Sequence, residues 1–153
     1  MQTLARMADL FGIQMGEFAA VGTQRSRIMR VKDRPRTVLA AGVNWLELAS
    51  PGHALEPAIL MVPPGIGNGG LVVRAGEIFI LVQLGELTIQ LQNPPESVTL
   101  KSGDSIILDA GTPHSWCNLG WHPAACLGVE QIGTLAKQTV VKAQSAIGRG
   151  CVL

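Results

Sequence analysis

The sequence has little charge, few aromatic residues and no long hydrophobic run. Charged residues make up 15% of the 153 residues and the formal net charge is +1, so composition gives no overall bias toward nucleic acid. Because 47% of the residues are hydrophobic, we expect one packed globular domain rather than a disordered chain. No apolar run approaches the roughly 20 residues that span a bilayer. We therefore expect no membrane partner.

Cysteine is scarce and odd in number. Cys117, Cys126 and Cys151 show no paired metal-binding spacing, and a count of three argues against a disulfide framework. Residues 1–20 carry charged side chains within an apolar pattern, unlike the uncharged core of a secretion signal. These features together predict a cytoplasmic protein.

Glycine and proline, by contrast, are abundant, with 18 and 9 residues. From about residue 43 they separate short apolar runs, which are strand-sized and have no helical pattern between them. The runs cover residues 43–50, 58–64, 77–85, 86–92, 97–103, 104–111 and 125–133. This spacing predicts an all-β barrel or sandwich.

Two segments of this region resemble the motifs of the cupin superfamily. "GEIFILVQLGELTI" is similar to the Gly-rich end of the first motif, with Gly85 in place, and "GDSIILDAGTPHSWCN" is similar to the second, with His114 and Asn118 in place. The resemblance covers about residues 57–131 and implies a jelly-roll barrel, usually dimeric. It also implies a divalent metal held by two His and a Glu from the first motif and one His from the second.

The chain departs from the family at the metal ligands. Val72, Arg74 and Ile78 stand where the family has His, His and Glu, and only His114 remains. Val and Ile offer no lone pair, and the permanent charge of Arg74 would repel a cation. We therefore expect no metal, no cofactor and no catalytic residues.

The same positions predict a different site. Alternate residues of a barrel strand share a face, so Val72 and Arg74 are expected to face the lumen together, beside the inner face of the next strand. An apolar lumen with one Arg and one His suits a small organic ligand such as a carboxylate. The predicted ligand-binding residues are Arg74, His114, Val72, Ile78, Ile80 and Trp116.

Three of these residues also have a purely structural interpretation. Arg74 could lie at the barrel mouth in water, or be tied to Glu77 or Glu130. His114 could be a satisfied core residue, and Trp116 could serve packing alone.

The N-terminal stretch carries a second resemblance. "QTLARMADLFGIQMGEFAAV" is similar to the closing helices of the helix-turn-helix domain of XRE-family transcriptional regulators, and six of the twelve basic residues follow within residues 25–36. In that family a DNA-binding domain, a basic linker and a cupin domain occur in this order. The expected units are remnant helices at 1–22, a basic linker with the first strands at 23–56, the cupin barrel at 57–131 and a tail at 132–153.

Three functions remain open. The leading hypothesis is a small-molecule-sensing cupin domain of an XRE-type regulator, present as a homodimer, with DNA contacted only through a missing N-terminal domain. The alternative is a cupin enzyme (an isomerase, dioxygenase or decarboxylase) with an atypical active site. The third is a structural module whose barrel is filled by its own side chains.

Overall fold

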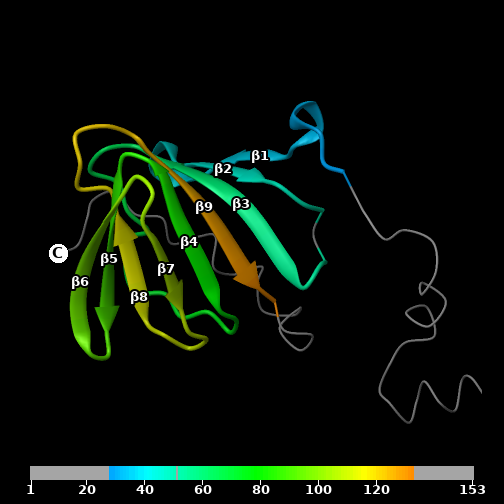
Figure 1. Ribbon diagram of the computed structural model, residues 1–153. Coiled ribbons are helices and arrows are strands. Elements are labelled where there is room, and N and C mark those ends of the chain that lie inside the picture. Colours follow the sequence, from blue (N-terminus) through cyan, green and yellow to red (C-terminus); the bar gives the residue numbers. More distant parts are fainter. Residues whose placement is uncertain (1–27, 51, 133–153) are drawn as a thin grey trace, which may run out of the picture.

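The computed structural model describes residues 28–50 and 52–132, and within these ranges nine strands form two antiparallel sheets (Figure 1). Two 3-10 turns, η1 (Val31–Asp33) and η2 (Ala40–Gly42), flank the first strand. The strands are β1 (Arg36–Val38), β2 (Asn44–Glu47), β3 (Leu55–Val62), β4 (Ile78–Leu84), β5 (Glu86–Gln92), β6 (Pro95–Lys101), β7 (Ser105–Leu108), β8 (His114–Cys117) and β9 (Ala124–Gln131).

The two sheets face each other, and the connections between strands carry the chain from one sheet to the other. The larger sheet has the order β1-β2-β3-β9-β4-β7, and the smaller sheet, at the left of Figure 1, has the order β6-β5-β8. Strands far apart in sequence are neighbours, because β9 pairs with both β3 and β4 while β5 pairs with β8. This antiparallel jelly roll confirms the predicted all-β fold class.

Alternation along the strands fills the space between the sheets with apolar side chains. In β4, Ile80 and Val82 are buried in the core, while Phe79 and Leu81 point to the opposite face. A fully buried Val, Leu or Ile side chain contributes about 1.5–3 kcal/mol, so the core cluster is the main source of stability. It consists of Val43, Val62, Ile80, Val82, Leu87, Ile89, Leu100, Leu108, Ala124 and Cys126.

A single residue, Gly85, carries the chain from β4 in the larger sheet to β5 in the smaller one. Its φ is +75°, and a Cβ at this position would lie 2.8 Å from the carbonyl oxygen of Pro123. Only glycine meets both conditions without strain. The glycine of the first motif is therefore required by the crossing between the sheets.

Some predictions do not match the elements observed. Val72 and Arg74 were expected to lie on a barrel strand, but they fall outside the strands, and Val72 makes only an isolated bridge to His114. No apolar run was predicted at β8, where His114 and Ser115 interrupt the apolar pattern, whereas β1 falls within the unit at 23–56 that was expected to hold the linker and the first strands. The helical segment predicted at 1–22 and residues 133–153 of the predicted tail lie outside the described residues.

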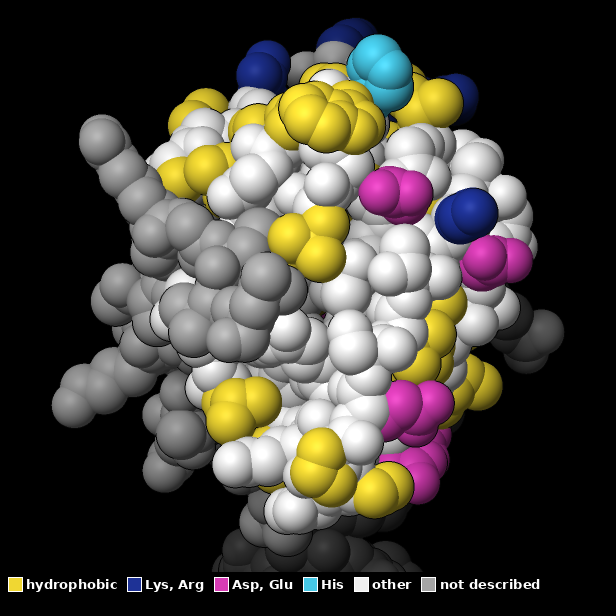
Figure 2. Space-filling view, turned by 90° about the vertical axis from the view of Figure 1, so that its left-hand side faces the viewer, with side chains coloured by type: hydrophobic (Ala, Val, Ile, Leu, Met, Phe, Trp, Pro, Cys, Tyr) yellow, Lys and Arg dark blue, Asp and Glu magenta, His cyan; other side chains and the backbone are white. Residues whose placement is uncertain are grey.

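On the face that Figure 2 presents, the Lys and Arg side chains lie in the upper part, and acidic side chains lie together at the lower right. Among the described residues on this face, the Lys and Arg side chains stand apart from one another, and apolar side chains form separate groups. Arg36, from the predicted basic linker, donates two hydrogen bonds to Oδ1 of Asn44, at 3.0 and 2.6 Å. Within the described ranges, no helix has the length and hydropathy needed to cross a membrane.

Candidate functional site

The segment before β4 lies antiparallel along β8 and is held there by backbone hydrogen bonds. The N–H of Val72 donates to the carbonyl of His114 (2.7 Å), and the N–H of His114 donates back to Val72 (2.9 Å). Further along, the N–H of Asn68 donates to the carbonyl of Trp116 (3.1 Å), and its Oδ1 accepts from the N–H of Trp116 (3.1 Å). These bonds bring the two motifs of the sequence together in space.

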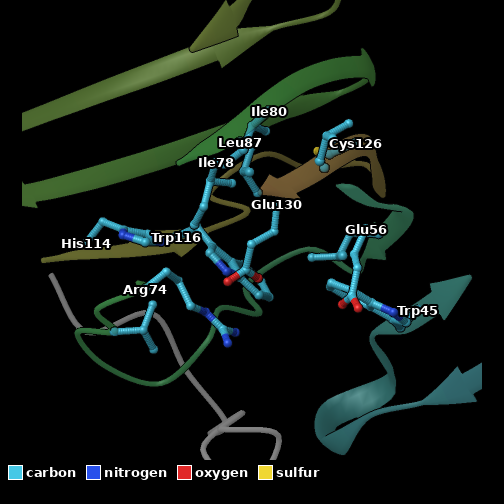
Figure 3. Close-up of a pocket in the computed structure, with 14 residues that line it drawn as sticks. Trp45, Glu56, Arg74, Ile78, Ile80, Leu87, His114, Trp116, Cys126 and Glu130 are labelled. Atoms are coloured by element: carbon cyan, nitrogen blue, oxygen red, sulfur yellow. The ribbon is translucent and has the colours of Figure 1, made fainter. Parts of the chain in front are cut away.

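A cavity of about 110 Å³ lies between the two sheets beside this segment (Figure 3). Its apolar floor comprises Ile78, Ile80, Leu87 and Cys126, and its charged rim comprises Glu56, Arg74 and Glu130 (Figure 3). The other lining residues are Trp45, Leu60, Val72, His114, Trp116, Gly128 and Val129. Because space remains between the sheets, the structure does not support a barrel filled by its own side chains.

All six residues predicted to bind a ligand lie on the wall of this one cavity. They are Val72, Arg74, Ile78, Ile80, His114 and Trp116, and they come from β4, β8 and the segment before β4. Their proximity is a finding of the structure, whereas their role in binding stays a prediction.

His114 is buried, with 3% of its surface exposed, and its ring is oriented by one hydrogen bond. Nδ1 lies 2.9 Å from the carbonyl oxygen of Thr112. A carbonyl can only accept, so Nδ1 carries the proton, and in the neutral ring Nε2 is left as an acceptor. Burial lowers the pKa of His114, the hydrogen bond to Thr112 opposes this, and the charge of Arg74 lowers it further. The imidazole is therefore neutral at pH 7.

Arg74 is half-buried at the cavity rim, and its backbone is fixed by a hydrogen bond from the N–H of Gly111 to its carbonyl (2.8 Å). Its guanidinium makes no hydrogen bond or ion pair with the rest of the described chain. Glu77 is exposed and does not line the cavity. Glu130 does line it, and Arg74 affects its pKa without forming an ion pair. The structure therefore leaves the donors of Arg74 available.

Three polar or aromatic lining residues were not among the predicted site residues. Glu130 shares the inner face of β9 with Cys126 and Gly128, so strand alternation could have found it. Glu56 and Trp45 are brought to the cavity by the pairing of β2, β3 and β9, which no local pattern reveals.

Glu130 has a raised pKa, mainly because burial penalises its charged form. The charge of Arg74 lowers this pKa, and the neighbouring charge of Glu56 raises it. Its carboxylate has no hydrogen-bond or ion-pair partner in residues 28–50 and 52–132. Glu130 is thus a poorly neutralised acid that faces the cavity.

The side chains present do not fit the divalent metal implied by the cupin resemblance. His114 is the only imidazole on the cavity wall, and Val72, Arg74 and Ile78, which also line it, stand where the motif resemblance implies the other three ligands. In the part of the chain that the structure describes, no three His, Cys, Asp or Glu side chains are grouped so that they could hold a metal ion. One imidazole supplies too few donors for a specific site.

The two described cysteines differ in state. Cys126 is a free thiol on the cavity floor, and burial raises its pKa to about 11, so it is protonated at neutral pH. Cys117 is disulfide-bonded, which the odd number of cysteines did not lead us to expect. Because a disulfide is present, the odd cysteine count no longer supports a cytoplasmic location. That location stays a prediction.

Comparisons with known proteins bear on the fold and the family. The most similar structures include hydroxypropylphosphonic acid epoxidase from S. wedmorenis, at 20% identity and a TM-score of 0.60, covering 85% of this chain and 74% of that one. A cupin superfamily protein from Desulfitobacterium hafniense is similar at 14% identity and a TM-score of 0.53, with 72% and 84% covered. A protein of unknown function from Streptococcus pyogenes is similar at 14% identity and a TM-score of 0.54, with 72% and 91% covered. At these identities the likeness shows the fold alone.

Comparison with curated proteins found no match. The family model described as the cupin domain matches residues 58–130, nearly the range expected from the two motifs. The sequence match and the jelly-roll topology agree with each other. Residues 58–130 of this chain therefore form a cupin domain.

Proposed function

We propose that this cupin domain binds a small organic molecule in the cavity between its sheets and serves as the sensing domain of an XRE-type transcriptional regulator. In this proposal the protein is a cytoplasmic homodimer, and a separate N-terminal domain contacts DNA. Ligand binding favours one arrangement of the two subunits, and that preference is transmitted to the DNA-binding domains. No metal takes part.

The observation that carries the proposal is a cation without a protein partner at the rim of an apolar cavity. The guanidinium of Arg74 keeps its donors free among the described residues while its backbone is fixed. A planar guanidinium is suited to hold a carboxylate through two parallel hydrogen bonds. The floor formed by Ile78, Ile80 and Leu87 would then take the apolar body of the same molecule.

Tryptophan fluorescence offers a direct test. The chain has three Trp and no Tyr; Trp45 and Trp116 line the cavity, whereas Trp121 is 93% exposed. In a Trp121→Phe variant, all tryptophan emission comes from the cavity wall. We expect titration with a panel of small carboxylic and amino acids to produce a saturable change for at least one compound.

Two arginine substitutions in the Trp121→Phe variant distinguish a direct contact with the ligand from a general effect of positive charge. Arg74→Ala should weaken the binding of that compound at least about tenfold, because a hydrogen bond to a charged group is lost. Arg30→Ala removes the same charge from an exposed position away from the cavity and should leave the affinity unchanged. Equal affinities in the Arg74→Ala variant and its parent would rule out the assigned contact.

A metal-free cupin enzyme is the second candidate, favoured by the presence of both His114 and Glu130 on the wall of one cavity. The fixed tautomer of His114 leaves Nε2 as a possible base, and the raised pKa of Glu130 suits a proton donor on the same cavity wall. Proton exchange at the methyl group of pyruvate in D₂O, followed by NMR, tests it. Exchange that is catalysed by the protein and lost in His114→Gln would favour an isomerase; binding of small acids without exchange would favour the sensor.

A further inference from the structure

We infer that the cavity selects a small molecule that carries an ammonium group as well as an acidic group, in preference to a simple carboxylate. The inference rests on the proposed binding function and specifies the ligand class that the charged rim recognises. An aliphatic α-amino acid has this arrangement, with both charged groups at one end and an apolar body at the other.

Two acidic side chains of the rim lie on directly paired positions. In the antiparallel pairing of β3 with β9, Glu56 is opposite Glu130, and both residues line the cavity. Side chains at opposite positions of a ladder are close neighbours, and like charges there repel each other. The pair therefore favours a group that brings positive charge or hydrogen-bond donors.

The described residues provide little positive charge and few hydrogen-bond donors to offset this repulsion. Glu130 has no hydrogen-bond or ion-pair partner there, and Glu56 accepts only a long bond of 3.5 Å from the N–H of Gly52. Among the described lining residues Arg74 is the single cation, and burial lowers the pKa of His114. The described rim thus has two acidic side chains and one guanidinium, so a simple carboxylate ligand would add a third acidic group beside a single cation.

The geometry places the complementary groups on the same side of the cavity. In Figure 3, Glu130 lies between Arg74 and Glu56, and the apolar side chains Ile80, Leu87 and Cys126 lie on the other side. A ligand with adjacent carboxylate and ammonium groups can thus face Arg74 with one and the two glutamates with the other. The volume of about 110 Å³ is below the 150 Å³ of a cavity that admits benzene, so the apolar body is short.

Three probes that share the same branched apolar body test the inference. Valine carries both charged groups, isovalerate is valine without its amino group, and isobutylamine is valine without its carboxylate. Each is titrated into the Trp121→Phe variant, and the affinity is read from the fluorescence of Trp45 and Trp116. We expect valine to bind at least about tenfold more tightly than either of the other two.

Substitutions test which side chain is responsible for each difference in affinity between valine and the other two probes. Glu130→Gln should remove the advantage of valine over isovalerate, and Arg74→Ala should remove its advantage over isobutylamine. Glu56→Gln repeats the first test if Glu130→Gln does not fold, and Glu96→Gln on exposed β6 is the matched charge control.

The outcomes separate this inference from the function on which it rests. Isovalerate binding as tightly as valine would overturn the ligand class and leave small-acid binding intact. Isobutylamine binding as tightly as valine would overturn the part assigned to Arg74. No saturable response to any of the three probes would count against both the ligand class and the proposed function.

Discussion

The two sides of the cavity differ in what holds their side chains. On the floor, Ile80, Leu87 and Cys126 are buried members of the core cluster, each surrounded by other apolar side chains. On the rim, Arg74 and Glu130 are half-buried and have no hydrogen bond or ion pair with the described residues. The floor side chains are therefore held in place by core packing, whereas the rim side chains make few stabilising contacts.

This difference bears on function because folding alone does not explain the residue types on the rim. Apolar residues on the floor are needed to bury surface between the sheets, with or without a ligand. A half-buried Arg and a Glu with a raised pKa add charge that the protein only partly neutralises. Unneutralised polar groups that face a cavity are the usual mark of a binding site. Substitutions on the two sides should thus separate stability from binding.

The largest effect is expected on the floor. Leu87 is 2% exposed, so Leu87→Ala removes buried methyl groups and enlarges the cavity, which should lower the free energy of unfolding by about 2–5 kcal/mol. Denaturation in urea measures this loss. Leu84→Ala is the matched control, because Leu84 is 63% exposed and should change the same quantity by less than about 0.5 kcal/mol. Equal losses in both variants would mean that the floor is not part of the stabilising core.

Local sequence patterns predict the floor better than the rim. Alternation along β4 is enough to place Ile78 and Ile80 on one face, and the two motifs indicate that Arg74 and His114 belong to one site. Glu56 could not be assigned in this way, because its place at the rim depends on the register between β3 and β9, about 70 residues apart in the chain. Strand pairing over such a distance is set by the whole fold and leaves no local signal.

A smaller effect is expected from Glu130→Gln, and it depends on pH. The pKa of Glu130 is raised above its ordinary value of 4.5 in the folded state, so the folded protein binds the proton more tightly than the unfolded chain does. The wild type therefore loses stability as the pH rises from about 4.5 through the raised pKa, and the variant lacks this loss. Glu56 lies beside Glu130 on the paired strand, and Arg74 and His114 line the same cavity.

Thermal unfolding of the Glu130→Gln variant and the wild type checks this between pH 4 and pH 8. The variant should gain stability relative to the wild type as the pH rises, by about 1 kcal/mol or less. Glu96→Gln, at an exposed position, should show no such trend. A relative loss of stability at pH 8 would mean that the ionised Glu130 has a stabilising partner.

The smallest effect on stability is expected on the rim, from Arg74→Ala. The guanidinium has no bonded partner among the described residues, so the free energy of unfolding at pH 7 should fall by no more than about 0.5 kcal/mol, although ligand affinity should fall at least about tenfold.

The sign of the small loss follows from Glu130, because the charge of Arg74 holds the pKa of that carboxyl down. Removing Arg74 raises this pKa further, so the variant should lose slightly more stability than the wild type as the pH rises above about 4.5. Since the loss acts through the carboxylate, it should disappear when Arg74→Ala is made in a Glu130→Gln background. A loss of about 2 kcal/mol or more, persisting in that background, would instead make Arg74 a structural residue like those of the floor.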